Sequence, residues 1–282
     1  MATDVTTQVP DRLESIRSGR AEPVVIARGV LVREFAGKSC GAQRFSTGSA
    51  TFEPRAVLPY HTHPISEAIT VISGMARVAI EGRRYLLQPF DSVHIPREVA
   101  HEVCNPSATS DLVALSVFAS AEPTRQEVQA NFAIIEKGLT KPLPGDPESL
   151  VRFAEAELYE LSPGAQFRDL FAGRLGSVGI CGGYGRFLPE SSLPCHTHLY
   201  DESITIVEGE AVCLVKGSHY SLSNCDTAVV PEGRPHRFLN LSASPMAMLW
   251  VYAGSEPERT LVPASLCNGN LVWSGENHPA LR

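Results

Sequence analysis

The chain has 282 residues, 43% of them hydrophobic, so it is long enough for two domains of ordinary size with a core in each. Its formal net charge is −7 and no run of Lys or Arg is dense, which argues against nucleic acid and against a membrane as partners. The first 20 residues lack the apolar core of a secretory signal, and the longest apolar stretch, around 112–119, is too short to span a bilayer. We therefore expect a cytoplasmic protein.

The strand and turn signals divide the chain into two units. Short segments rich in Val, Ile and Thr lie at 68–73 and 76–81, and similar segments recur at 203–208 and 211–216. Between them, 124–138 carries a helical apolar pattern (Val128, Phe132 and Ile135), followed by the breaker-rich stretch 141–147. These signals predict an all-β chain with domains at 1–140 and 141–282 and a short helical linker.

Two further composition features have plain structural interpretations. The glycines between 173 and 185 are not followed by Gly-Lys-Ser/Thr, so bulges or a sharply curved strand explain them better than a phosphate loop. The seven cysteines are odd in number and include no Cys-x-x-Cys pair, which argues against a disulfide framework and a thiolate zinc site. We expect unpaired thiols, with Cys195 buried and pointing away from the cavity that the neighbouring His196 faces.

An internal repeat is the strongest signal in the chain. Residues 59–105 and 194–240 align without a gap and share sixteen identities in forty-seven positions. The pairs that carry chemistry, all 135 positions apart, are His61/His196, His63/His198, Glu67/Glu202, Gly74/Gly209, His101/His236 and Asn105/Asn240. The chain is therefore two copies of one unit.

The repeated His and Glu residues have the pattern of a metal site. His61, His63 and Glu67 have the i, i+2, i+6 spacing that puts side chains on one face of a strand, or of two strands joined by a tight bend. His101 comes from another strand that faces the same cavity, and the same holds for the second set: His196, His198, Glu202 and His236. Three imidazoles and a carboxylate favour Fe or Mn, then Ni, Zn, Cu or Co, one ion per barrel, with positions left open for a substrate.

Both sets, with their surroundings, resemble the cupin superfamily over nearly the whole chain. The first motif, His-x-His, then Glu, then Gly, is met from His61 to Gly74 and from His196 to Gly209; the second, Gly, Pro, His-x-x-x-Asn, is met from Gly82 to Asn105 and from Gly217 to Asn240. The resemblance implies two tandem β-jelly-roll barrels (double-stranded β-helices), a bicupin with a metal in each. The chain departs from the family where a glycine is expected six residues before the first His, at Arg55 and Glu190.

The resemblance to quercetinase-like cupins leads to a metal-dependent dioxygenase as the first hypothesis, with a small enolic or aromatic substrate and dioxygen as partners. It implies that Glu67 or Glu202 acts as a catalytic base. A non-oxidative isomerase, lyase or hydrolase of a sugar acid or keto acid is the alternative, and a non-catalytic ligand-binding cupin is the third. Cupins often pair through their outer sheets, so a homodimer is the default.

Strand alternation suggests which side chains would meet the substrate. It puts Val103 beside His101 and Phe238 beside His236 on the cavity side, where apolar walls are also what any barrel core requires. Tyr200 and Asp201 have no counterpart in the first unit and are candidates for substrate contact in the second. The sequence does not indicate which barrel is catalytic.

Overall fold

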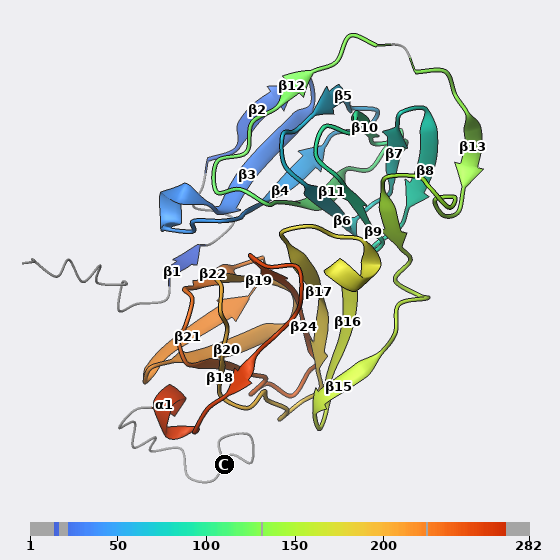
Figure 1. The fold of residues 1–282 in the computed structure, drawn as a ribbon. Helices are drawn as coiled ribbons and strands as arrows, with labels where there is room; N and C mark the ends of the chain where they lie inside the picture. The colour runs from blue at the N-terminus through green and yellow to red at the C-terminus, as the bar shows by residue number, and fades with distance from the viewer. Residues whose placement is uncertain (1–13, 17–21, 131, 224, 269–282) are drawn as a thin grey trace, which may run out of the picture.

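The computed structural model describes residues 14–16, 22–130, 132–223 and 225–268, which form two β-sandwich barrels in sequence (Figure 1). In each barrel one sheet has seven strands and faces a smaller sheet of six or five. The predicted strand segments are present as β6, β7, β19 and β20, within one residue at each end. The all-β fold of two tandem jelly-roll barrels is confirmed.

The first barrel is built from thirteen strands. Its seven-stranded sheet has the order β14 (Ser149–Val151), β9 (Ser92–Ile95), β6 (Glu67–Ser73), β11 (Leu112–Phe118), β4 (Ser46–Phe52), β3 (Val30–Ala36) and β2 (Val24–Ala27). Its six-stranded sheet has the order β12 (Gln126–Glu127), β5 (Val57–Thr62), β10 (His101–Cys104), β7 (Ala76–Ile80), β8 (Arg83–Leu87) and β13 (Glu136–Leu139).

The second barrel repeats this plan. Its seven-stranded sheet has the order β1 (Glu14–Ile16), β22 (Thr227–Val230), β19 (Glu202–Glu208), β24 (Met246–Tyr252), β17 (Cys181–Phe187), β16 (Ala165–Phe171) and β15 (Tyr159–Ser162). Its five-stranded sheet has the order β21 (Ser218–Ser223), β20 (Glu210–Val215), β23 (His236–Leu239), β18 (His196–Thr197) and β25 (Thr260–Leu261). The described helices are single turns: η1 (Lys38–Cys40), η2 (Gly173–Leu175) and α1 (Ser265–Asn268).

The two large sheets lie against each other between the barrels, which explains their composition. All seven residues of β24 are buried, because alternate side chains enter the barrel core and the contact between barrels. Met248 faces the core of the second barrel, whereas Leu249 packs with Leu115 and Val117 of β11 in the inter-barrel cluster. Strands buried on both faces read as continuous apolar runs.

Each barrel also takes one strand from the far side of the predicted domain boundary. β14 pairs with β9 of the first barrel, and β1 pairs with β22 of the second. Glu148, directly before β14, holds this segment to β8 of the first barrel. Its buried carboxylate accepts two hydrogen bonds from Arg83 (2.7 and 2.8 Å) and one from Tyr85 (2.6 Å). The boundary at 140/141 stays a prediction.

The predicted helical linker is wrong. Residues 126–127 form β12, which pairs with β5, and residues 136–139 form β13, which runs parallel to β8. The aromatic ring of Phe132 packs on that of Tyr60, with centroids 4.8 Å apart. The apolar spacing therefore reflects a segment laid across the first barrel, whose edge strands supply the backbone hydrogen bonds that a helix would have made internally.

The departures from the cupin glycine pattern fall in strained turns. Arg55 and Glu190 adopt left-handed backbone conformations, with φ of 65° and 64°. A glycine reaches this region without steric cost, which explains the residue type expected there.

The glycine-rich segment 181–185 is β17, a strand rather than a loop. The register against β16 shifts between Asp169 and Phe171, where Leu170 of β16 is the extra residue, so this bulge lies on the neighbouring strand and not at the glycines. A Cβ at Gly183 would lie 2.6 Å from the indole of Trp250, and a Cβ at Gly185 would lie 2.7 Å from the ring of Phe167. These glycines make room for aromatic side chains of neighbouring strands.

Candidate metal centres

In each barrel a bend between the two sheets brings the four predicted ligands together. His61 lies on β5, His63 follows it, and Glu67 begins β6 on the opposite sheet after the bend at residues 64–66. His101 begins β10 and is the direct cross-strand partner of His61. The second barrel has the same arrangement, with the register pair His196 and His236 and the residues His198 and Glu202.

The four side chains converge on one point in each barrel. One ligand atom from each residue lies within 4.8 Å of those from the others, and all eight residues are buried. Glu67 Oε2 is 3.0 Å from His101 Nε2 and 3.3 Å from His63 Nε2. In the second barrel Glu202 Oε2 is 2.7 Å from His236 Nε2 and 3.4 Å from His198 Nε2.

Backbone carbonyls fix the tautomer of every ligand histidine. Nδ1 donates to the carbonyl two residues earlier in four of them: His61 to Pro59 (2.7 Å), His101 to Val99 (3.1 Å), His196 to Pro194 and His236 to Arg234 (both 2.8 Å). A carbonyl only accepts, so Nδ1 carries a proton and Nε2 is the nitrogen that faces the centre and is available to a metal. Such a hydrogen bond is the usual support of a metal-binding imidazole.

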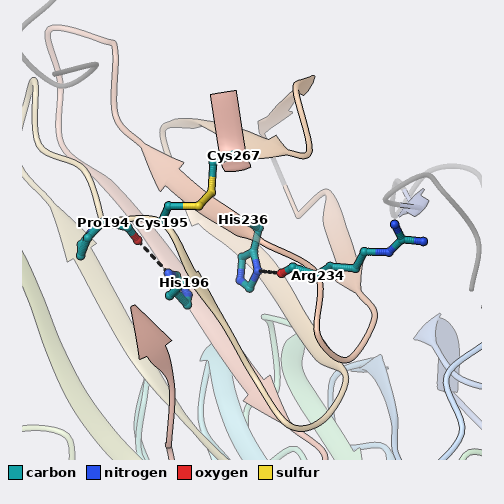
Figure 2. The surroundings of a disulfide bond; sticks show 6 residues. All are labelled: Pro194, Cys195, His196, Arg234, His236 and Cys267. Carbon is teal, nitrogen blue, oxygen red and sulfur yellow. Dashed lines mark hydrogen bonds between the residues drawn. A yellow bond between two sulfur atoms is a disulfide. The ribbon is translucent and has the colours of Figure 1, made fainter. Parts of the chain in front are cut away.

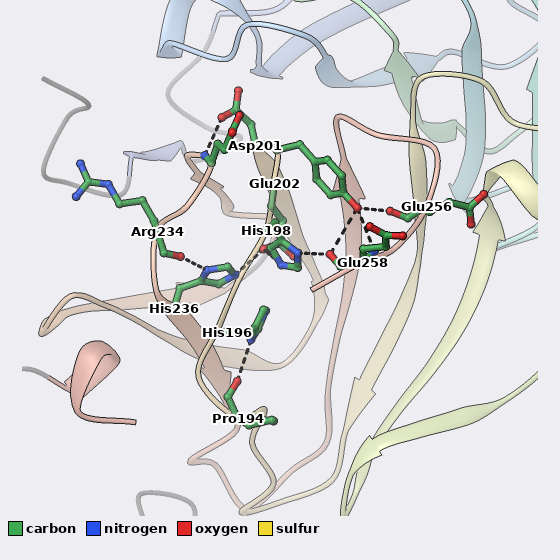
Figure 3. Close-up of polar contacts among 11 residues, drawn as sticks. Pro194, His196, His198, Asp201, Glu202, Arg234, His236, Glu256 and Glu258 are labelled. Atoms are coloured by element: carbon green, nitrogen blue, oxygen red, sulfur yellow. Dashed lines mark hydrogen bonds and ion pairs between the residues drawn. The ribbon is translucent and has the colours of Figure 1, made fainter. Parts of the chain in front are cut away.

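The remaining two histidines are held by a segment far along the chain. Nδ1 of His63 donates to the carbonyl of Thr124 (2.7 Å), and Nδ1 of His198 donates to the carbonyl of Glu258 (2.8 Å). Figure 3 shows the second of these bonds beside the contacts of His236 and Glu202. Nε2 of His63 and of His198 is buried, and its nearest polar neighbour in the described structure is the carboxylate of Glu67 or Glu202, at 3.3 or 3.4 Å, outside hydrogen-bond geometry. A divalent cation bound by these imidazoles and by the carboxylate would satisfy all of them at once, so the residues fit a divalent metal.

The pKa shifts favour the metal-binding protonation state at His61, His196 and Glu67, but not at His63, where burial would lower the pKa and the neighbouring Glu67 carboxylate outweighs burial and raises it. Burial, with a smaller contribution from His101, lowers the pKa of His61 to about 3, and burial lowers the pKa of His196 well below its ordinary value. Burial would raise the pKa of Glu67, but the neighbouring His101 and His63 outweigh burial and hold that pKa below the usual range. A neutral imidazole and an ionised carboxylate are the metal-binding forms.

The cavity at the first centre is large and apolar. It has a volume of about 470 Å³, opens on His61, His63 and Glu67, and is lined by Val103 as predicted. The other apolar walls come from Ile26, Val32, Phe52, Leu58, Ile69 and Phe118. Arg125 is the only charged side chain besides Glu67 among the described residues that line it.

The cavity at the second centre is smaller and more polar, with a volume of about 260 Å³. Phe238 lines it as predicted, where the first barrel has Val103, and Met248 and Trp250 stand where the first barrel has Ala114 and Ser116. These larger side chains account for the loss of volume.

The polar wall of the second cavity was not expected from the sequence. Asp169 accepts hydrogen bonds from the hydroxyl of Tyr159 (2.6 Å) and from Arg174 (2.7 Å), and Arg259 completes this side. These residues come from β15, β16, the η2 turn and the segment before β25, outside both cupin motifs. No motif in the sequence marks these positions as part of the site.

Tyr200 and Asp201 lie beside the second centre but outside the described lining of its cavity. The ring of Tyr200 stacks on His198 with centroids 6.2 Å apart, while its hydroxyl donates to the carbonyl of Glu256. Asp201 faces the first barrel, where it accepts from the backbone N–H of Gln43 (3.3 Å). Substrate contact by Tyr200 stays a prediction.

A disulfide adjoins the second centre, contrary to the expectation of unpaired thiols. Cys195 is bonded to Cys267 of α1, 72 positions further along the chain, with Cα atoms 6.0 Å apart (Figure 2). Cys195 points away from the cavity because it directly precedes His196, and residues 262–268 fold back over that outer side, where no sequence spacing could place a partner. Cys104, Cys181 and Cys213 are buried thiols, as expected.

Fold and site together define a protein with two jelly-roll barrels and a three-histidine, one-glutamate metal centre in each. The Cupin domain family matches residues 48–118 and 183–252, which is half of the chain. The chain therefore belongs to the cupin family, and with two tandem copies it is a bicupin. No curated protein sequence matches it at a significant level.

Solved structures of oxalate decarboxylase from Bacillus subtilis have a similar fold. One single-residue mutant of that enzyme superposes with a TM-score of 0.72 at 17% identity, covering 92% of this chain and 81% of that chain. Another structure, described for its Mn(II) centres, gives a TM-score of 0.71 at 16% identity, covering 90% and 80%. At this level of sequence identity, the structural similarity shows a shared fold alone. Among the described residues, no helix is long and apolar enough to cross a membrane.

Proposed function

We propose that this bicupin is a metal-dependent dioxygenase whose first barrel takes a small enolic or aromatic substrate. The observation that carries the proposal is the apolar cavity of about 470 Å³ that opens directly on His61, His63 and Glu67. Its volume lies in the range of small-molecule sites, roughly 300–1,000 Å³. A two-carbon diacid would leave most of it empty and would meet few polar partners.

The side chains of the chain have defined roles in this proposal. Val103, Ile69 and Phe118 contact the apolar body of the substrate and exclude water from the reacting end. Glu67, and Glu202 in the second barrel, accept the proton of the enolic or phenolic hydroxyl. Iron or manganese, or else nickel, zinc, copper or cobalt, would be held by the three histidines and the glutamate, and supplies Lewis acidity toward that hydroxyl together with redox chemistry toward dioxygen.

Oxygen uptake tests the proposal, after the metal content of the purified protein has been measured. With phenolic and diketone compounds as substrates, we expect one dioxygen consumed per substrate. His101→Ala should abolish uptake in the first barrel and His236→Ala in the second, because each removes a ligand. His219→Ala, an exposed histidine on β21, is the matched control and should retain uptake. Undiminished uptake in the double variant H101A/H236A would refute the proposal.

The second cavity favours a non-oxidative reaction as the other candidate. Its volume of about 260 Å³ and its polar wall of Tyr159, Asp169 and Arg174 suit a short, polar keto acid or sugar acid. The structurally similar proteins are named oxalate decarboxylases, which supports a lyase of this general kind. Turnover that continues under strict anaerobiosis, or with zinc as the only metal, would establish this candidate in place of the dioxygenase.

A further inference from the structure

A second internal repeat lies outside the cupin motifs. Residues 122–125 read Glu-Pro-Thr-Arg and residues 256–259 read Glu-Pro-Glu-Arg, and alanines stand three positions earlier, at 119 and 253. The separation is 134 positions, one less than that of the metal ligands. The two copies thus share an arginine, Arg125 in the first and Arg259 in the second, which neither cupin motif includes.

The backbone fixes both arginines at equivalent places beside the metal centres. The residue before each one, Thr124 or Glu258, accepts the Nδ1 hydrogen bond of a ligand histidine. The residue after each one begins a short strand, β12 or β25, that pairs with the strand carrying the first ligand. Each arginine is therefore held on both sides by the elements that build the centre.

Both side chains line the metal cavities and are half-buried there. A guanidinium offers five donors, and Arg125 uses one described hydrogen bond, from its Nη2 to the carbonyl of Ile26 (3.2 Å). Within the described residues, no carboxylate lies at ion-pair distance from Arg125 or Arg259, whereas Arg83, Arg152 and Arg174 each have such a partner. Burying part of an unpaired guanidinium costs free energy, which an anionic ligand would offset.

We propose that Arg125 and Arg259 are the substrate-anion anchors of the two barrels and that each barrel takes an organic carboxylate. The planar fork of a guanidinium matches a carboxylate with two parallel hydrogen bonds, which gives orientation as well as affinity. The anchored carboxylate holds the rest of the molecule toward the three-histidine, one-glutamate centre. This inference rests on the proposed function in one respect, that the cavities hold substrate.

The size and polarity of each cavity favour a different kind of carboxylate. About 470 Å³ with apolar walls accommodates an aryl carboxylate in the first barrel. About 260 Å³, narrowed by Phe238 and Trp250, accommodates a short aliphatic keto acid in the second. Benzoate and pyruvate are suitable probes, and benzyl alcohol is the neutral counterpart of benzoate with the same ring.

Isothermal titration calorimetry on the metal-loaded full-length protein tests the anchors. Arg125→Ala should weaken benzoate binding about 10- to 100-fold, the cost of a lost charged hydrogen-bond pair, and should leave benzyl alcohol unchanged. Arg259→Ala should do the same for pyruvate and leave benzoate unchanged. Arg125→Lys should lie between wild type and Arg125→Ala, because it keeps the charge and loses the fork.

Arg84→Ala is the matched control, because Arg84 is a half-exposed arginine on β8 whose neighbours Arg83 and Tyr85 face inward. It should bind both probes as wild type does. Unchanged affinity for both probes in Arg125→Ala and Arg259→Ala, or an equal loss for benzyl alcohol, would overturn the proposal. Failure of the dioxygenase proposal is distinguishable, since benzoate would then bind through Arg125 while no substrate consumes oxygen.

Discussion

The chemistry of each metal centre depends on backbone groups as much as on side chains. Six carbonyls orient the six imidazoles, and four of these carbonyls belong to the residue two positions before the histidine. The conformation of that local turn decides whether the hydrogen bond forms, and a sequence pattern does not specify it. Residue types alone therefore predicted the ligands, whereas the tautomer of each ligand followed from the structure.

The motif asparagines illustrate the same limit. Asn105 and Asn240 were found by the repeat, but their side-chain amides bind backbone carbonyls. The side-chain amide of Asn105 donates to the carbonyls of Phe52, Glu53 and Ser110, and that of Asn240 to three equivalent carbonyls. They tie together loops at the end of each barrel. A polar residue that recurs in both copies can therefore be either a metal ligand or a residue whose hydrogen bonds stabilise the loops.

Gly183 is the residue-scale test of how the second cavity is shaped. Gly183→Ala should destabilise the protein by about 1–3 kcal/mol, because the added methyl would meet both the indole of Trp250 and the carbonyl of Arg168. Urea unfolding measures this loss, and Trp fluorescence should report a changed environment of Trp250. Gly37→Ala is the control, since its methyl would meet only the flexible carboxylate end of Glu34. Equal stabilities of the two variants would contradict the packing argument.

At the scale of elements, periodicity predicted strands well and misassigned the linker. The strands of each unit lie in two facing sheets and bury either alternate residues or all of them. Their apolar pattern can therefore be recognised in the sequence. The segment 124–138 has apolar residues at helical spacing, but its backbone pairs with β5 and β8 instead. A short apolar pattern does not distinguish a free helix from a chain laid along a sheet edge.

The disulfide links α1 to the strand that begins the second centre, and its removal is the element-scale test. Cys267→Ser should lower the free energy of unfolding by about 2–4 kcal/mol, because the unfolded chain would lose a long-range constraint. Wild-type protein treated with dithiothreitol should fall to the same value, and the variant should not respond to the reductant. Thiol titration in denaturant should find five of the seven cysteines reactive. Seven reactive thiols without reductant would contradict the bond.

At the scale of the whole molecule, the two barrels are joined by an apolar contact between their large sheets. Leu115 and Val117 of β11 meet Leu249 and Val251 of β24 in one cluster. Around it, Thr47 and Ser203 hydrogen-bond across the contact at 3.3 Å, and Arg44 pairs with Glu232. Arg44 also donates to the carbonyl of Leu199, so the loop between His198 and Glu202 rests on the first barrel. The expected homodimer stays a prediction, which sedimentation would test.

His94 makes the contact between the barrels sensitive to acid. It lies on β9, where its Nε2 accepts the backbone N–H of Val178 from the second barrel (3.3 Å), and burial lowers its pKa from 6.5 to about 4. The unfolded chain binds the proton from about pH 6.5, whereas the folded chain resists it until about pH 4. Stability present above pH 6.5 should thus fall by about 3 kcal/mol as the pH drops to 4.

His94→Gln should remove this part of the acid response, because a glutamine oxygen accepts the same N–H and does not titrate. Urea unfolding of wild type and variant at intervals between pH 4 and pH 7 gives the difference directly. Parallel curves for the two proteins would mean that other groups account for the acid response. The ligand histidines contribute equally to both proteins, so they cancel in the comparison.

The sequence by itself determined the repeat, the jelly-roll fold and all eight metal ligands, because a duplicated motif constrains residue types at fixed spacing. Only the tertiary structure decided which residues outside the motifs reach the centres. Arg125 reaches its cavity because β12 pairs with the distant β5, Tyr159 and Asp169 line the second cavity from a hairpin outside the motifs, and Cys267 meets Cys195 from 72 positions away. Such contacts arise from how the sheets close, which spacing along one segment does not record.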